Sequence, residues 1–169
     1  HPRPMNETKI YGADTSKWLD RGIDSTHGMQ TFWRNILGGF ASSRFHRPPS
    51  GLGLSETAQA QLRSARLLLA ELDIFRCEPD SGHSLLVGRE TNAAYLTRID
   101  GEQYAVYFPD GGRVGLDLRR ATGRFECRWL AVDGSRWAGT REVSGGDVVP
   151  LAPPASGQWV ALLCRAAGT

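Results

Sequence analysis

The stretch FASSRFHRPPSGLG, residues Phe40–Gly53, decides how the first half of the chain folds. Its first part, Phe40–Phe45, reads as a strand that becomes polar at Arg44. His46 and Arg47 then lead into a loop rich in Pro and Gly. In βα-barrels, active-site groups lie at the C-terminal ends of strands, where a strand gives way to polar residues in this manner. The same pattern also fits a strand that ends at the solvated surface, so the flanking segments must be considered.

Helix-like segments flank this stretch on both sides. Before it, Ser25–Leu37 carries apolar residues three and four apart, which predicts one apolar stripe on a helix. After it, Ala and Leu repeat at the same spacing from Ser55, the expected N-cap, to about Leu72. A short strand is expected at Thr8–Gly12, followed by a loop at Ala13–Asp24. The order strand, helix, strand, helix is typical of parallel βαβ architecture.

The character of the sequence changes near residue 84, from helical periodicity to short strands separated by turns. A linker-like stretch, EPDSGH at 78–83, separates an expected first domain at 1–80 from a second at 84–169. Asp-Gly and Gly-Gly pairs mark the turns, and many short strands at close spacing predict an antiparallel β-sandwich. The eight expected strands are Leu85–Gly88, Ala93–Ile99, Gln103–Phe108, Arg113–Leu118, Gly123–Leu130, Trp137–Val143, Val148–Leu151 and Trp159–Arg165.

The bulk composition is that of an ordinary globular protein. Of 169 residues, 40% are hydrophobic and 22% are charged, and the formal net charge is +2. So small a charge does not favour nucleic acid or an anionic membrane as a partner, and no apolar run approaches the roughly 20 residues of a membrane span. Two βα units cannot close a barrel, which takes roughly 250 residues. Because the chain begins at His1, we expect a longer protein or a processed product.

No cofactor and no metal are expected. The cysteines Cys77, Cys127 and Cys164 form no CxxC pair and have no histidine at metal-ligand spacing. Free thiols that pack as small hydrophobic residues are the expected state, with a Cys127–Cys164 disulfide as the alternative. The glycine pairs lack the spacing of a phosphate-binding loop, and the sequence contains neither GxSxG nor HExxH.

The polar residues at the two strand ends are candidates for a binding site. Alternation along a strand places Arg44 and His46 on one face, where Arg can clamp a carboxylate or sugar hydroxyls and His can exchange a proton. By the same rule Lys9 and Tyr11 share a face of the first strand and extend the same pocket. The competing interpretation is structural: an arginine paired with an acid elsewhere and a histidine that caps the loop.

Acids and aromatic residues complete the set of candidates. Glycoside hydrolysis needs two carboxyl groups that flank one bond, and the acids near the expected strand ends are Glu7, Asp14 and Asp20. None has a partner fixed by spacing, so a solvated loop acid is the competing interpretation for each. Trp18 is a candidate platform for a sugar ring, whereas Trp33 fits the core of its helix better.

With both halves in view, the chain resembles the C-terminal end of apiosidase-like glycoside hydrolases of the DUF4038 type, which carry a collagen-binding-like domain at their C-terminus. The segments that carry the likeness are RPMNETKIYG at 3–12, FWRNILGGFASSRFHRPPSGLGLSE at 32–56, YAVYFPDGGRVGLDL at 104–118 and LAPPASGQWVALL at 151–163. The resemblance implies an α/β part plus an all-β part: the last two βα units of a (β/α)8 TIM barrel at about 1–77, then an antiparallel β-sandwich from about 84 to 169.

The resemblance also implies a function, namely hydrolysis of a complex glycan by two carboxylates, at least one of them on an earlier strand outside this chain. The N-terminal remainder of the same protein would complete the barrel, and a secreted or periplasmic location is expected. Glu7 is the candidate acid, offset from the strand end where the family pattern places one. The candidate substrate-binding residues are Arg44, His46, Lys9, Tyr11, Arg47 and Trp18. A non-catalytic carbohydrate- or matrix-binding or structural module is the alternative, because these residues supply no carboxylate pair.

Overall fold

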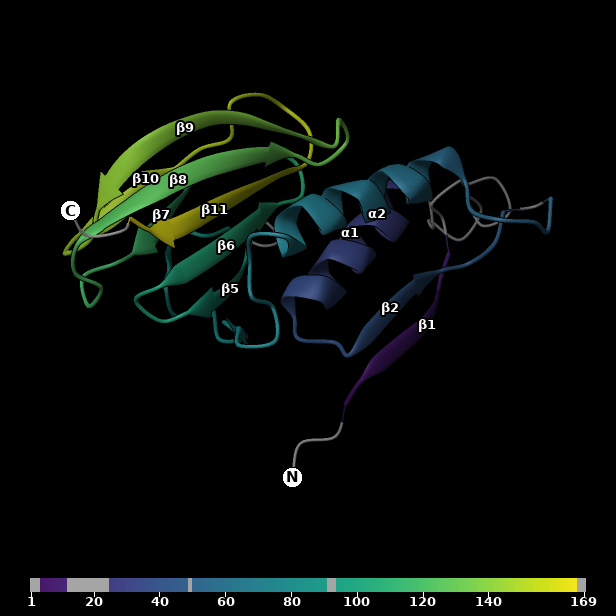
Figure 1. Cartoon of the computed structure of the whole chain (residues 1–169), viewed down its shortest axis with the longest axis horizontal. Helices are drawn as coiled ribbons and strands as arrows, with labels where there is room; N and C mark the ends of the chain where they lie inside the picture. The colour runs from purple at the N-terminus through teal and green to yellow at the C-terminus, as the bar shows by residue number, and fades with distance from the viewer. Residues whose placement is uncertain (1–3, 12–24, 49, 91–93, 167–169) are drawn as a thin grey trace.

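The computed structural model describes residues 4–11, 25–48, 50–90 and 94–166. These residues form two helices and three sheets: a parallel pair of strands, a three-stranded sheet and a six-stranded sheet, the last two antiparallel throughout (Figure 1). The protein is therefore rich in antiparallel sheet, with its helices confined to the first half. Neither described helix has the length and apolar character that crossing a membrane requires.

The first half forms the parallel βαβ arrangement that the sequence predicts. Strand β1 (Asn6–Ile10) and strand β2 (Ser42–Phe45) pair in parallel, and the helix α1 (Ser25–Leu37) lies between them in the chain. Strand β1 lies earlier in the chain than the expected strand Thr8–Gly12, and β2 is shorter than the expected strand Phe40–Phe45. The pairing of the two strands begins where Asn6 lies opposite Ser42. The Ser42 hydroxyl donates to Asn6 Oδ1 at 2.9 Å, which fixes this end of the pair.

The second helix, α2 (Glu56–Leu69), begins as predicted and ends earlier than predicted. The Ser55 hydroxyl accepts a hydrogen bond from the backbone N–H of Ala58 at 3.1 Å, which is N-cap geometry. Its buried face includes Ala58, Ala65 and Leu68, in agreement with the predicted stripe. The helix stops at Leu69 with Ala70 as C-cap, and the chain then tightens into a turn, although Leu72 is still buried.

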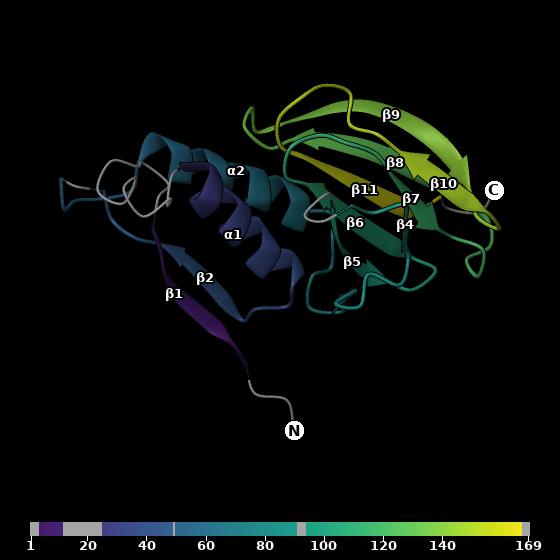
Figure 2. The same ribbon diagram turned by 180° about the vertical axis from the view of Figure 1, so that it is seen from behind.

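The six-stranded sheet is buried on both faces at its centre, whereas its edge strand at Arg136–Ser144 is mostly exposed. Along the central strand β6 (Gln103–Phe108), Tyr104, Val106 and Phe108 face one hydrophobic core, while Ala105 and Tyr107 face another. The first core lies between the two antiparallel sheets, and the second lies between this sheet and the helices (Figure 2). In spatial order the sheet consists of β3 (Glu78–Pro79), β5 (Tyr95–Ile99), β6 (Gln103–Phe108), β11 (Trp159–Arg165), β8 (Arg124–Ala131) and β9 (Arg136–Ser144).

The three-stranded sheet closes the far side of the first core. Its order is β10 (Val148–Leu151), β7 (Val114–Asp117) and β4 (Leu86–Val87), and β7 pairs antiparallel with both neighbours. Each of the eight segments expected to be strands overlaps one of the observed strands, although β8 and β9 extend beyond the expected ends. The domain boundary between residues 80 and 84 stays a prediction.

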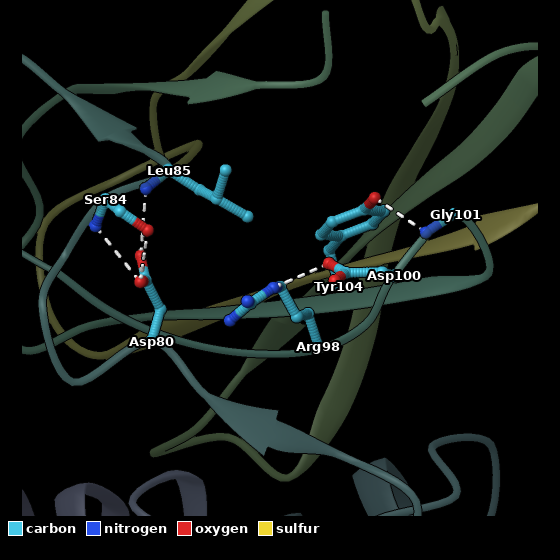
Figure 3. A network of polar contacts seen from close by, with 7 residues as sticks. All are labelled: Asp80, Ser84, Leu85, Arg98, Asp100, Gly101 and Tyr104. Atoms are coloured by element: carbon cyan, nitrogen blue, oxygen red, sulfur yellow. Dashed lines mark hydrogen bonds and ion pairs between the residues drawn. The ribbon is translucent and has the colours of Figure 1, made fainter. Parts of the chain in front are cut away.

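One prediction for this half was wrong, because the stretch at 78–83 is more than a linker. Its first two residues form β3 and pair with Thr97 and Arg98 of the six-stranded sheet. The Asp80 carboxylate then accepts hydrogen bonds from the Ser84 backbone and hydroxyl and from the Leu85 N–H, at 2.9 to 3.0 Å (Figure 3). Burial alone would raise the pKa of Asp80, but these three hydrogen bonds outweigh it and lower that pKa.

The cysteines are free thiols, as expected. Cys127 is buried in the core between the antiparallel sheets, whereas Cys164 packs on the opposite face of the same sheet, against the core under the helices. Opposite faces exclude the alternative disulfide. Burial raises the pKa of both thiols, so neither is activated as a thiolate.

Candidate functional site

The C-terminal ends of β1 and β2 lie side by side, because the two strands are parallel neighbours. A concavity of about 430 Å³ opens there, and we call it the strand-end concavity. Lys9, Arg44, His46 and Arg47, four of the predicted binding residues, line it together. The remaining lining residues are Thr8, Phe45, Gly53 and Leu54.

Arg44 is held at this end by the neighbouring strand. Its Nε donates to the backbone oxygen of Thr8 at 3.3 Å, so one edge of the guanidinium is occupied and the terminal nitrogens remain for a ligand. The side chain lies on the face of the strand pair that points away from the helices, next to buried Phe45 on the opposite face. Arg44 is therefore oriented but exposed, as a ligand-binding arginine must be.

His46 follows β2 directly and is fixed through both its backbone and its ring. Its backbone N–H donates to the Ile10 oxygen at 2.8 Å, which extends the pairing of the two strands by one residue. Ring atom Nδ1 lies 2.9 Å from the Arg47 backbone oxygen. Because a carbonyl oxygen can only accept, this contact assigns a proton to Nδ1, so the tautomer that can accept a hydrogen bond does so at Nε2.

Tyr11 reaches the same place from the end of β1. Its ring stacks on the His46 ring, with centroids 4.6 Å apart and an interplanar angle of 27°. Tyr11 and Lys9 also line a smaller hollow of about 160 Å³, together with Glu7, Ile10, His27 and Thr31. Lys9 lines both hollows, so the two lie next to each other at the end of β1.

Glu7, the candidate acid, lies in the smaller hollow and does not line the strand-end concavity. It sits in the first half of β1, in register with Ser43, and its Oε1 accepts from the Lys9 N–H at 3.4 Å. No described acidic residue lines the strand-end concavity. Two other acids considered from the sequence, Asp14 and Asp20, lie outside the described residues, as does Trp18.

Sequence reasoning missed the contribution of α1 to the site. His27 and Thr31 are four residues apart, hence on one face of the helix, and both border the smaller hollow. The four-residue spacing of His27 and Thr31 could have been used to place both residues on one face of the expected helix. Trp33 is a core residue, as expected from its place in the helix. It is fully buried and stacks on Tyr107 with ring centroids 5.7 Å apart.

The part of the chain that the structure describes holds no group of three or more His, Cys, Asp or Glu side chains that could bind a metal ion. The side chains of the strand-end concavity offer three cations and a histidine, with a stacked tyrosine ring beside them. Such groups can orient and neutralise an anionic or hydroxyl-rich ligand.

No model of a known protein family matches this chain, and no curated protein matches it either. Solved structures that resemble it are glycoside hydrolases. One is a glycoside hydrolase family 5 protein from Bacteroides vulgatus ATCC 8482, with a TM-score of 0.61 and 16% identity over 98% of this chain. Another is described as a glycoside hydrolase, with a TM-score of 0.65 and 15% identity over 95% of this chain.

A third similar structure is an alpha-amylase from Anoxybacillus, with a TM-score of 0.53 and 10% identity over 98% of this chain. The chain spans 40%, 40% and 39% of the lengths of these three proteins. At such low identity the likeness concerns the fold. The chain therefore has the fold of part of a glycoside hydrolase.

Proposed function

We propose that this chain is the C-terminal part of a glycoside hydrolase that acts on a complex glycan, of the apiosidase-like, DUF4038 type. The observation that carries the proposal is the convergence of Lys9, Arg44 and His46 at the C-terminal ends of two parallel, helix-covered strands. Barrel enzymes act at this end of their strands. In this proposal the two antiparallel sheets form an accessory β-sandwich of the collagen-binding-like kind.

The exposed face of the strand pair supports the barrel interpretation. Asn6, Thr8, Ser42 and Arg44 are all exposed, polar and on or beside the face turned away from the helices. In a closed barrel that face points into the interior, and its top supplies the site. The proposal places the remaining strands, and at least one catalytic carboxylate, in the N-terminal remainder of the protein. Because a polymeric glycan is met outside the cytoplasm, the proposal includes a secreted or periplasmic location.

The described residues would take distinct roles in such a site. The Arg44 guanidinium and the Lys9 ammonium would hold substrate oxygens, with Arg47 at the rim. Nε2 of His46 would accept a proton or a hydroxyl hydrogen bond, while the Tyr11 ring keeps the imidazole in place. Glu7 is the candidate acid of this chain, acting from the smaller hollow.

The test is Arg44→Ala in the longest natural protein that contains this chain, assayed for release of reducing ends from a panel of plant polysaccharides. We expect turnover or substrate binding to fall at least tenfold with unchanged thermal stability, because a charge-assisted hydrogen bond to a ligand is worth about 1.5–3 kcal/mol. Arg113→Ala, an exposed arginine next to β7, is the matched control. Equal turnover and binding in the two variants would show that Arg44 does not contact substrate.

A second candidate function is carbohydrate binding without catalysis, and one observation favours it. Phe75 is 99% exposed, on a tight turn between α2 and the six-stranded sheet. Beside it a concavity of about 500 Å³ is lined by Asp73, Arg76, Glu102, Gln103, Cys164, Arg165 and Ala166. An exposed aromatic ring next to polar groups of balanced charge suits a neutral sugar ring.

Affinity electrophoresis of the chain in gels with and without soluble polysaccharide separates the two candidates. Retardation that Phe75→Ala abolishes and Arg44→Ala leaves intact would favour the binding module. Retardation that depends on Arg44 alone would favour the strand-end concavity. No retardation in any polysaccharide would count against this second function.

A further inference from the structure

Positive charge is concentrated at the strand-end concavity. Lys9, Arg44 and Arg47 line it, and none of the three forms an ion pair with a described residue. The acids nearest to its lining residues in the sequence are Glu7 and Glu56, and neither of them lines the concavity. Five other arginines of the chain do pair with carboxylates, namely Arg76, Arg98, Arg119, Arg124 and Arg128.

Three like charges around one hollow repel one another, and a concave surface focuses their field. An arrangement of this kind is relieved when an anion binds between the cations. The volume of about 430 Å³ lies within the range of small-molecule sites. The concentration of positive charge therefore points to an anionic ligand.

The hydrogen-bonding character of the lining narrows the ligand further. Arginine and lysine side chains only donate, so their partner must be rich in acceptors. A neutral sugar hydroxyl both donates and accepts and is matched best by mixed pairs, such as Arg76 with Glu102 at the other concavity. A carboxylate or a sulfate ester offers acceptors only, which complements Lys9, Arg44 and Arg47.

We propose that the strand-end concavity binds an oxyanion carried on a saccharide, either the carboxylate of a uronic acid or a sulfate ester. The proposal rests on the proposed function in taking the ligand to be a glycan. Arg44 is the central contact, because its Nε bond to the Thr8 oxygen orients the terminal nitrogens before the ligand arrives. Lys9 and Arg47 flank it, one from each strand end.

The experiment is isothermal titration of the 169-residue chain with four probes at low and at high salt. The probes are an oligogalacturonate, a sulfated carrageenan oligosaccharide, a neutral β-galacto-oligosaccharide and inorganic sulfate. We expect one of the two acidic saccharides to bind at least tenfold more tightly than the neutral one, and high salt to weaken that binding. The first two probes separate a carboxylate from a sulfate ester as the recognised group.

Variants assign the binding to this concavity. Arg44→Ala should weaken binding of the acidic saccharide about tenfold or more, because it removes a charge-assisted contact. Arg44→Lys keeps the charge but loses the two-pronged geometry, so its affinity should lie between those of the parent and the alanine variant. Arg113→Ala removes the same charge elsewhere and should leave the affinity unchanged. Equal loss in Arg44→Ala and Arg113→Ala would overturn the assignment.

The remaining outcomes distinguish this inference from the proposed function. Salt-insensitive binding of the neutral oligosaccharide that depends on Arg44 would overturn the oxyanion inference and leave the glycoside hydrolase proposal standing. Binding of inorganic sulfate while none of the three saccharides binds would overturn the saccharide part of the inference, whereas the proposed function is tested separately by the release of reducing ends. Absence of binding by all four probes would overturn the inference outright.

Discussion

The parallel strand pair and the six-stranded sheet both pack against the helices, yet they differ in their other face. The centre of the six-stranded sheet is buried on both sides, under the helices and under the three-stranded sheet (Figure 2). The strand pair is apolar only toward the helices, through Ile10 and Phe45, and polar on the side away from them. Parallel strands in complete domains are usually covered on both faces. The uncovered face is thus where the chain keeps polar groups for something other than its own core.

Polar contacts link α1 to α2 and the helices to the six-stranded sheet. The indole N–H of Trp33 donates to Gln61 Oε1 at 2.6 Å, and the Tyr107 hydroxyl donates to Gln158 Oε1. Both amides also donate to Met29 Sδ, at 3.2 and 3.4 Å. Burial raises the pKa of Tyr107, so its hydroxyl stays protonated and remains a donor. These bonds fix the helices on the sheet in one orientation.

The largest expected effect comes from removing the ring at the centre of this contact. Trp33→Ala should lower the free energy of unfolding by about 3–5 kcal/mol, because Trp33 is fully buried and the change leaves a large cavity. Urea denaturation followed by circular dichroism measures it. Phe75→Ala removes a fully exposed ring and is the control, with an expected change within about 0.5 kcal/mol. A similar small loss in both variants would mean that the helices do not depend on the sheet.

A smaller effect is expected from the amide that serves Trp33. Gln61→Leu keeps the size of the side chain but leaves the buried indole N–H without its acceptor, so it should cost about 1–3 kcal/mol. Gln59→Leu, on the exposed side of the same helix, is the matched control. A neutral or stabilising Gln61→Leu would show that packing alone joins the two regions. The same urea denaturation decides.

The sequence indicated in part that the centre of the six-stranded sheet is buried on both faces. YAVYF at 104–108 is a continuous apolar run, and such a run is typical of a strand covered on both faces. The helices followed from periodicity and the Ser55 cap. Strand β3 did not, because two residues that include a proline show no alternation and pair only through Thr97 and Arg98. The partner of Trp33 was equally hidden, since Gln61 is 28 residues away in the sequence.

The site was predictable to a similar degree. Parallel strands bring their C-terminal ends together, so the convergence of Lys9, Arg44 and His46 follows from the βαβ order. The Nε bond of Arg44 to Thr8 and the stacking of Tyr11 on His46 could not be read from the residues, because each depends on the register of the pair. The irregularity in β1 between Glu7 and Ile10 also escapes a strict alternation rule.

We expect the free energy of unfolding to depend on pH through Asp80, which lies where the chain passes from the helices to the antiparallel sheets. The folded-state pKa of Asp80 is lowered, so its contribution to stability is present above the ordinary aspartate pKa of about 3.9 and is lost as the pH falls through the lowered value. Asp80→Asn should cost about 1–2 kcal/mol at neutral pH, because the amide cannot accept all three hydrogen bonds.

Urea denaturation of wild type and Asp80→Asn at about pH 7 and about pH 3 measures the difference. Other carboxylates also lose their interactions in acid. One is Asp117, because its hydrogen bond with Arg119 lowers the pKa of Asp117 to about 2. Only the gap between the two proteins reports on Asp80, and it should narrow at the lower pH. If the difference in the free energy of unfolding between the two proteins stays constant with pH, the ionised form of Asp80 does not stabilise the fold more than its protonated form does.

The smallest effect on stability is expected on the uncovered face itself. Arg44→Ala should change the free energy of unfolding by no more than about 0.5 kcal/mol, since the side chain is exposed and its hydrogen bond to the Thr8 oxygen is long at 3.3 Å. Its neighbour Phe45 is the sharpest control. That residue is buried, stacks on Phe32 with centroids 4.7 Å apart, and should cost about 3–5 kcal/mol on truncation to Ala.

Two adjacent residues of one strand would then differ by a large fraction of the stability of a small domain, according to the face on which each lies. If Arg44→Ala proved as damaging as Phe45→Ala, the arginine would be a structural part of the strand pair, and the argument that this face is kept for a ligand would fail. If it is neutral for folding, an oriented but unpaired cation at a strand end has no structural explanation. Binding then remains as the reason for its position.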